Sequence, residues 1–341
     1  MVPPTITKSR SRLALMAALA ACLAGCHKPA QKPRPGVDLS YLPAEVVFVA
    51  YADTVRLKES SLYRDWDTRL SGGGERLTEA KTFLRRLGID PEKDVDGLML
   101  AYRPGPETGE WVALLRGRFD LPRMKRGLDD ASSRMAAEPH GRWMIYSLAL
   151  VPEVGDLSVC LVDESAVALG KGEALKRILD AREHPAGSLA GKGNLKALIP
   201  SLQPSAQIWA LLDGRYLSRL TEAAGQLSGG MTTSALGSLS TIVSATLSVT
   251  LDADLSARLD LGSDTEAHAR SLSDGLRGIL GFARLGSVAK KKDWQGLVDA
   301  IRVDGDGKRV FVRLDLRGDL VKKLQAGMGE QGAAPPAGST R

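Results

Sequence analysis

The sequence is poor in cysteine, histidine and aromatic residues, and it lacks a long apolar run. Its 341 residues include three cysteines and four histidines, and 5% of them are aromatic. No two histidines are spaced as metal ligands are, so the sequence indicates no histidine metal site. No segment reaches the roughly 20 apolar residues that would predict a membrane-spanning helix. The composition, 43% hydrophobic and 25% charged, is typical of a globular protein with a real core.

Positive charge is present, but it is not concentrated. The formal net charge is +6, from 46 basic and 40 acidic residues. Loss of Lys8, Arg10 and Arg12 with the leader described below would leave 43 basic residues and a net charge of +3. Nucleic-acid-binding proteins usually gather positive charge on one face, whereas only residues 28–34 and 290–292 form short basic clusters here. We therefore expect no nucleic-acid partner.

The N-terminus has the pattern of a secretory signal peptide. Residues 1–12 carry three positive charges and no acid, and residues 13–23 form an apolar stretch too short to span a bilayer. Residues 23–26, Leu-Ala-Gly-Cys, then resemble the bacterial lipobox. In a lipobox the cysteine thiol takes up diacylglycerol, and the small residues before it fit the signal peptidase.

We predict cleavage before Cys26 and acylation of Cys26, with fatty acids such as palmitate. A single acyl chain anchors a protein marginally, whereas two or three make the anchor durable. The alternatives are a plain signal peptide with a coincidental cysteine, and an unprocessed core helix. His27, rather than Asp, follows the cysteine. By the rule familiar from enteric bacteria, this predicts the outer membrane, facing the periplasm, rather than the inner membrane.

Cys160 is the cysteine left free once Cys22 is removed and Cys26 is acylated. It lies in residues 157–162, an apolar run that predicts a buried strand. The mature chain could then form no internal disulfide and no cysteine metal site. A buried, unreactive thiol is the expected state, and a catalytic thiol is the alternative.

Composition and periodicity divide the chain into six parts. These are a signal peptide (1–25), the lipidated cysteine with a Pro/Lys-rich tether (26–39), a first α+β half (40–184), a linker (185–203), a second α+β half (204–325) and a disordered tail (326–341). Each half is predicted to run β-α-ββ-α-ββ-α. Runs of ββα units predict a mainly antiparallel sheet with helices on one face, and therefore an α+β fold.

An internal duplication is favoured by local similarity between the halves. Residues 111–119 are similar to residues 209–216, and in each a strand ends at a glycine and a helix soon begins. The alternative is that any strand–glycine–helix joint of this composition would look alike.

Three motifs suggest chemistry, and each is better explained by structure. Residues 304–307, Asp-Gly-Asp-Gly, lack the later ligands of an EF-hand, and the flanking alternation predicts a hairpin turn. Residues 187–193 lack the register and the hydroxyl residue of a phosphate loop. Ser287 and Lys290 match Ser-x-x-Lys without the other elements of penicillin-binding enzymes. We predict no catalytic residue, no cofactor site and no metal site, which leaves Cys26 as the predicted site.

Several boundary motifs resemble a group of uncharacterised exported lipoproteins of myxobacteria and related bacteria. The motifs are Leu42-Pro43-Ala44-Glu45, Ser61-Leu62-Tyr63, the run from Gly88 to Asp96, Gly117-Arg118-Phe119-Asp120 and the strand around Tyr146. The resemblance covers mainly residues 42–200. It implies a shared fold and assigns no catalytic residue.

The preferred functional hypothesis is a lipid-anchored, non-catalytic protein of the cell envelope. It would be held on the membrane through Cys26 and would bind an envelope protein partner or serve envelope assembly. One alternative is a carrier of an apolar ligand, such as a lipid, in a groove between the halves. Another is an envelope hydrolase whose site has no recognisable motif.

Overall fold

The computed structural model describes most of the chain, which divides into two units. The described residues are 38–70, 81–82, 84–105, 109–131, 136–148, 157–216, 240–285 and 292–331. The predicted signal peptide and Cys26 lie outside them, as do nearly all of the tether and the last ten residues. The two units are Met1–Asp213 and Gly214–Arg341.

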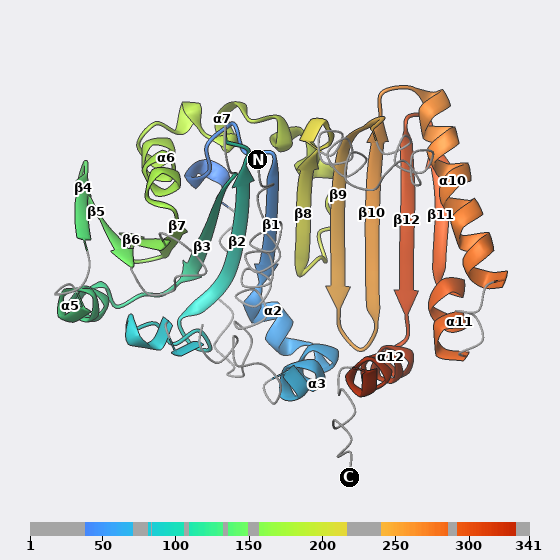
Figure 1. Ribbon diagram of the computed structural model, residues 1–341, viewed down its shortest axis with the longest axis horizontal. Helices are drawn as coiled ribbons and strands as arrows, with labels where there is room; N and C mark the ends of the chain where they lie inside the picture. Colours follow the sequence, from blue (N-terminus) through green and yellow to red (C-terminus); the bar gives the residue numbers. More distant parts are fainter. Residues whose placement is uncertain are drawn as a thin grey trace, which may run out of the picture. The chain divides into compact units, whose positions relative to one another are not determined.

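The first unit contains an antiparallel sheet (Figure 1). Its strands are β1 (Phe48–Asp53), β2 (Val95–Arg103), β3 (Glu110–Gly117), β4 (Ala136–His140), β5 (Trp143–Leu148), β6 (Leu157–Asp163), β7 (Ala166–Gly170) and β8 (Ile208–Asp213). They lie in the order β8-β1-β2-β3-β7-β6-β5-β4, and each neighbouring pair is antiparallel. A Pro/Gly sequence at residues 104–106 predicts a strand on each side of it, and these two strands are present as β2 and β3; residues 106–108 lie outside the described residues.

Helical segments of the first unit occupy the connections between strands. They are η1 (Leu39–Tyr41), α2 (Thr54–Glu59), α3 (Ser61–Leu70), α5 (Leu121–Ala131), α6 (Gly172–Glu183), η3 (Pro185–Gly187), α7 (Leu189–Lys192) and η4 (Asn194–Ser201). Residues 84–86 are also helical. The expected helices within 57–87, 121–135 and 173–182 are therefore present wherever the structure describes those residues.

The central strands of this sheet are apolar on both faces. Successive residues of a strand point to opposite faces, and in β2 Leu98 and Met99 are both buried. The same holds for Leu114 and Leu115 of β3. Met99 and Leu114 belong to one buried cluster together with α6 and α7 residues. Leu98 and Leu115 belong to a second cluster, together with α5 residues.

The expectation of helices on one face therefore needs correction in the first unit, whereas the predicted α+β class with antiparallel sheet is confirmed. Helical segments cover both faces because both faces carry apolar side chains that must leave water. Ile178 of α6 is buried in the first cluster, and Met124 and Leu128 of α5 are buried in the second.

Gly88 ends the helical segment at residues 84–86, as the sequence predicts. Its φ is +80°, a left-handed conformation that glycine adopts without a steric penalty. The Gly88 amide donates to the Arg85 carbonyl at 3.0 Å, and the Ile89 amide donates to the Leu84 carbonyl at 2.9 Å. These two bonds form a Schellman motif, and Leu84 and Ile89 are both buried, as the motif's apolar contact requires.

The predicted linker, residues 185–203, is part of the first unit. It forms η3, α7 and η4, and its Leu189 and Leu195 are buried in the first cluster. The unit boundary lies after β8, because β8 pairs with β1 in the register Ala210↔Ala50. Every buried hydrophobic residue of the described chain lies between Leu39 and Val321.

The second unit contains the strands β9 (Ile242–Leu251), β10 (Leu255–Ser263), β11 (Ile301–Asp306) and β12 (Arg309–Leu316). Its helices are α10 (Glu266–Leu285), α11 (Lys292–Asp299) and α12 (Gly318–Gln331). The strands lie in the order β9-β10-β12-β11 and pair antiparallel. This order repeats the order β2-β3-β7-β6 of the first unit, which supports an internal duplication.

The two halves nevertheless differ. Between α5 and α6 the first unit has four strands instead of the expected two. Residues 157–170 form the hairpin β6–β7, and β4–β5 is a second hairpin. In the second unit, two strands stand at the corresponding place, as predicted.

The strands of the second unit alternate between apolar and polar side chains. Leu259 and Leu261 of β10 face the side on which α10 lies, and Arg258 and Asp260 face the other side. Figure 1 shows α10 running alongside β11. Ala269, Leu272 and Ser273 are the buried residues of α10. In the described part of the chain, no helix combines the length and apolar character needed to cross a bilayer.

Replacement of Leu114 by alanine tests the two-faced core. Leu114 is fully buried, so Leu114→Ala should lower the free energy of unfolding by about 2–5 kcal/mol through lost burial and a residual cavity. Leu285→Ala, at a residue that is 88% exposed, should change it by less than about 0.5 kcal/mol. Urea unfolding followed by fluorescence of Trp143 and Trp209 would measure both, and equal midpoints would contradict the described core.

Candidate functional site

Cys26, the predicted lipidation site, lies outside the described residues. Cys160 lies in β6 and is buried, as expected. Burial raises the pKa of the Cys160 thiol to about 12. Because the thiolate is the nucleophilic form, the thiol in this position is unsuited to catalysis.

The motifs interpreted as structural have the expected conformations where they are described. Residues 304–307 include the turn of the β11–β12 hairpin, in which Asp306 pairs with Arg309 and Gly307 has a φ of +57°. Residues 187–193 run from η3 through α7, with no strand leading into them. Ser287 and Lys290 lie outside the described residues. Within the described ranges, no three His, Cys, Asp or Glu side chains group closely enough to hold a metal ion.

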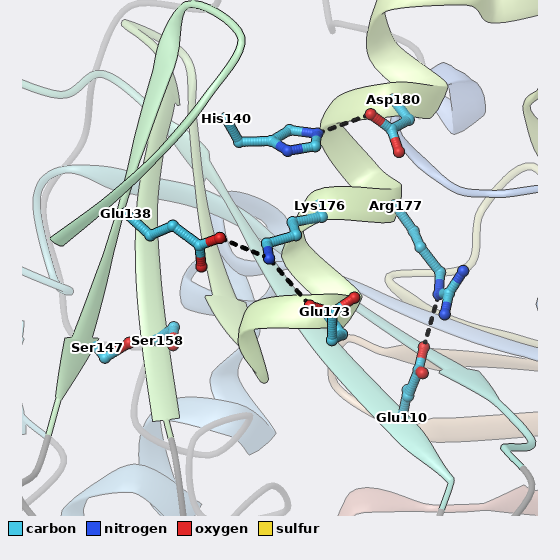
Figure 2. A network of polar contacts seen from close by, with 9 residues as sticks. All are labelled: Glu110, Glu138, His140, Ser147, Ser158, Glu173, Lys176, Arg177 and Asp180. Atoms are coloured by element: carbon cyan, nitrogen blue, oxygen red, sulfur yellow. Dashed lines mark hydrogen bonds and ion pairs between the residues drawn. The ribbon is translucent and has the colours of Figure 1, made fainter. Parts of the chain in front are cut away.

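A polar network joins α6 to the β4–β5 hairpin and to β3 (Figure 2). Lys176 Nζ lies 2.8 Å from the Glu138 carboxylate and 3.0 Å from the Glu173 carboxylate. His140 Nε2 lies 2.7 Å from Asp180 Oδ1. Exposed ion pairs of this kind contribute about 0–1 kcal/mol each, so the network positions the hairpin against α6 without dominating stability.

The same network continues to β3 through Glu110. Arg103 Nη2 lies 2.8 Å from one carboxylate oxygen of Glu110, and Arg177 Nε lies 3.3 Å from the other. Burial by itself raises the pKa of Glu110, but the two guanidinium groups outweigh it and hold the pKa below its usual value. Glu110 is therefore a charged anchor for α6, not a proton donor.

The His140–Asp180 pair resembles two members of a catalytic triad, but in the described ranges no Ser or Cys is a hydrogen-bond partner of His140. A triad needs a Ser or Cys within hydrogen-bond reach of the histidine. Among the described residues, Asp180 is the hydrogen-bond partner of His140. The hydroxyls of Ser147 and Ser158, also in Figure 2, contact each other at 3.4 Å across β5 and β6. These contacts connect α6 to β4 and β5 to β6.

A second polar cluster surrounds the buried Tyr41. Its ring lies between two guanidinium groups, 4.9 Å from Arg116 and 4.5 Å from Arg182. Its hydroxyl donates to Asp163 at 2.7 Å, and the Ser165 hydroxyl also donates to Asp163 at 2.7 Å. Burial by itself raises the pKa of Asp163, but hydrogen bonds from Ser165 and Tyr41 and the charge of Arg116 outweigh it and lower the pKa.

Two surface pockets of the described residues differ in size and lining. One, in the first unit, has a volume of about 20 Å³, which is room for about one water molecule. The other, in the second unit, has a volume of about 470 Å³ and lies between α10 and the β11–β12 turn. Its charged lining residues balance: Arg270, Arg277 and Arg309 against Glu266, Asp274 and Asp306. Neither pocket has the size and apolar walls that an acyl chain needs, so neither supports a lipid carrier.

The C-terminal half of α10 exposes large apolar side chains. Ile279, Phe282 and Leu285, which we call the α10 patch, are 57%, 79% and 88% exposed. They are three residues apart and therefore share one side of the helix. A surface helix usually turns such residues toward a core, and neighbouring exposed apolar residues mark interaction sites. The sequence predicts a helix over residues 265–284, but periodicity alone does not show which of its apolar side chains stay exposed.

Two of the motifs that carry the resemblance, the run from Gly88 to Asp96 and Gly117-Arg118-Phe119-Asp120, contact each other in the fold. The Arg118 amide donates to the Asp94 carbonyl at 2.9 Å. A side chain at Gly117 would collide with that same carbonyl, which explains the glycine. These two motifs therefore connect the residue before β2 to the end of β3.

Asp163→Asn tests the Tyr41 cluster through its pH dependence. A lowered carboxyl pKa stabilises the fold above the unfolded value of about 3.9, and the gain is lost as pH falls through the folded pKa. At pH 7 the free energy of unfolding of the variant should be about 1–3 kcal/mol lower than that of the parent. Near pH 3 this difference should be smaller. Urea unfolding at both pH values would measure this. Asp274→Asn, at an exposed residue, is the control, and a pH-independent loss in Asp163→Asn would contradict the assignment.

The buried thiol predicts a loss of stability at alkaline pH. Above about pH 8.5 the unfolded thiol ionises, whereas the folded thiol, with its pKa of about 12, keeps its proton. As pH rises above about 8.5, the free energy of unfolding should fall by up to about 1.4 kcal/mol per pH unit relative to that of Cys160→Ala. Urea unfolding at pH 7 and pH 10 measures the difference. Rapid reaction of the folded protein with a thiol reagent would refute the burial.

Comparisons with known proteins identify no family for the chain. No family model matches it, and no curated protein matches its sequence. Among solved structures, crystal form III of TP0453 has a TM-score of 0.47 and 9% identity, covering 88% of this chain and 100% of that one. Crystal form I of TP0453 has a TM-score of 0.46 and 10% identity, covering 86% of this chain and 99% of that one. These matches are too distant to support an argument about function.

Proposed function

We propose that the protein is a lipid-anchored, non-catalytic component of a bacterial cell envelope that acts by binding. Cleavage before Cys26 and acylation of that residue would hold the folded part on a membrane, in the outer membrane facing the periplasm. The resemblance to exported lipoproteins of myxobacteria agrees with this location. The α10 patch is the observation that carries the binding function.

Physical considerations favour binding over catalysis at the sites described. Burial keeps the Cys160 thiol protonated, the described partner of His140 is Asp180, and the arginine partners of Glu110 keep that carboxyl group charged. The α10 patch, in contrast, leaves apolar surface in water, and its burial against a partner is favourable. Binding is therefore the function that the described side chains support best.

Cys26→Ala tests the anchor. The native protein should begin at Cys26, carry added acyl mass and stay with the membrane fraction, because each buried CH₂ contributes about 0.8 kcal/mol to membrane binding. Cys26→Ala should carry no acyl mass and keep its leader or leave the membrane fraction. Mass spectrometry of the purified protein measures both outcomes.

Cys22→Ala is the matched control, because this cysteine lies four residues earlier in the same leader. It should be processed and acylated like the native chain. A native protein that keeps residues 1–25, or that begins at Cys26 without acyl mass, would contradict the proposal.

A further inference from the structure

The two halves of α10 differ in what they contact. Its buried residues, Ala269, Leu272 and Ser273, all lie in the N-terminal half and face the sheet. After Ser273, no described residue of α10 is buried. The α10 patch lies in this second half, so the sheet of the second unit leaves it uncovered.

The sequence around the α10 patch carries charge of one sign. Residues 275–292 contain five basic residues and no acidic residue. The five are Arg277, Arg284, Lys290, Lys291 and Lys292. Arg277 also contacts Asp274, and Arg284 also contacts Asp299, both at exposed positions. Such pairs are weak and exchange readily with other anions.

This combination matches the surface of an anionic membrane. Interfacial helices bury an apolar side with Phe and Leu at the headgroup boundary, and they carry Lys and Arg around it. Each basic residue near an anionic leaflet adds attraction. A second copy of the chain is a poorer partner for this patch, because the same stretch of its sequence has the same excess of positive charge.

Small residues beside the patch have no packing role in the described structure. A methyl group at Gly275 or Gly278, two turns and one turn before Phe282, would meet no atom within 4 Å beyond the helix's own backbone, and the same holds for Gly281. Glycine in a helix weakens it in water, and no close neighbour here compensates for that cost. Contact with an external surface that orders this half of α10 would offset the destabilising effect of these glycines.

We propose that the C-terminal half of α10 lies on an anionic lipid surface, with Ile279, Phe282 and Leu285 inserted at the headgroup boundary. This rests on the proposed function, because the anchor at Cys26 would keep the folded part close to the bilayer. Residues 26–37 span at most about 40 Å when fully extended, at roughly 3.3–3.6 Å per residue. The contact is a second, reversible membrane attachment.

Vesicle flotation of the chain 38–341 tests the contact without the anchor. This chain keeps every buried hydrophobic residue described, from Leu39 to Val321. It should float with vesicles of phosphatidylglycerol and phosphatidylcholine, and at least about tenfold less with phosphatidylcholine alone or at high salt. Phe282→Ser should weaken binding about tenfold or more through lost apolar burial. Ile199→Ser, at an exposed apolar residue of the first unit, should bind like the parent.

Both variants should unfold at the parent's urea midpoint, because both side chains are exposed. Equal flotation of the parent and Phe282→Ser would overturn the proposal. Equal binding to neutral and anionic vesicles would also overturn it, as would patch-dependent dimerisation without flotation. The two tests are independent. Failure of the chain 38–341 to float would not bear on acylation of Cys26, and absence of acyl mass on Cys26 would not change the flotation result.

Discussion

The first unit depends on one constraint, which is that its central strands are apolar on both faces. Both faces carry large apolar side chains, Leu98 and Leu115 on one and Met99 and Leu114 on the other. Exposure of either face to water would be unfavourable. Helical segments must therefore lie on both sides, with α6 and α7 on one and α5 on the other. The same requirement draws residues 185–203 into the fold, because Leu189 and Leu195 complete the cover of one face.

The second unit repeats the strand order of the first without repeating this constraint. Its strands alternate, so that Leu259 and Leu261 face α10, whereas Arg258 and Asp260 face the other side. One helix face is enough to cover one apolar sheet face, and α10 uses only its N-terminal half for this purpose. A duplicated topology can thus retain a helix whose remaining apolar surface stays exposed and available for another contact.

Charged groups in the first unit act as joints between elements. Glu110 connects β3 to α6, and Asp163 connects β6 to η1 through Tyr41. In both carboxyl groups, neighbouring donors and arginines outweigh the effect of burial on the pKa. Such groups stay ionised at neutral pH, which suits anchoring and is poorly suited to proton transfer. In the proposed arrangement, the lipid on Cys26 and the α10 patch would act as two linked attachments, and each would raise the effective concentration for the other.

The sequence by itself determined the features that depend on local order along the chain. The α+β class, the β2–β3 and β11–β12 hairpins, the stop at Gly88 and the buried strand around Cys160 all follow from periodicity and turn residues. The predicted leader and the predicted acylation of Cys26 rest on a linear signal, which needs no folded context. Tertiary structure alone decided what covers each face: helices on both sides of the first sheet, a packed segment instead of a linker, and an uncovered end of α10. The physical reason is that periodicity states which residues share a face, whereas burial depends on which distant segment packs against that face.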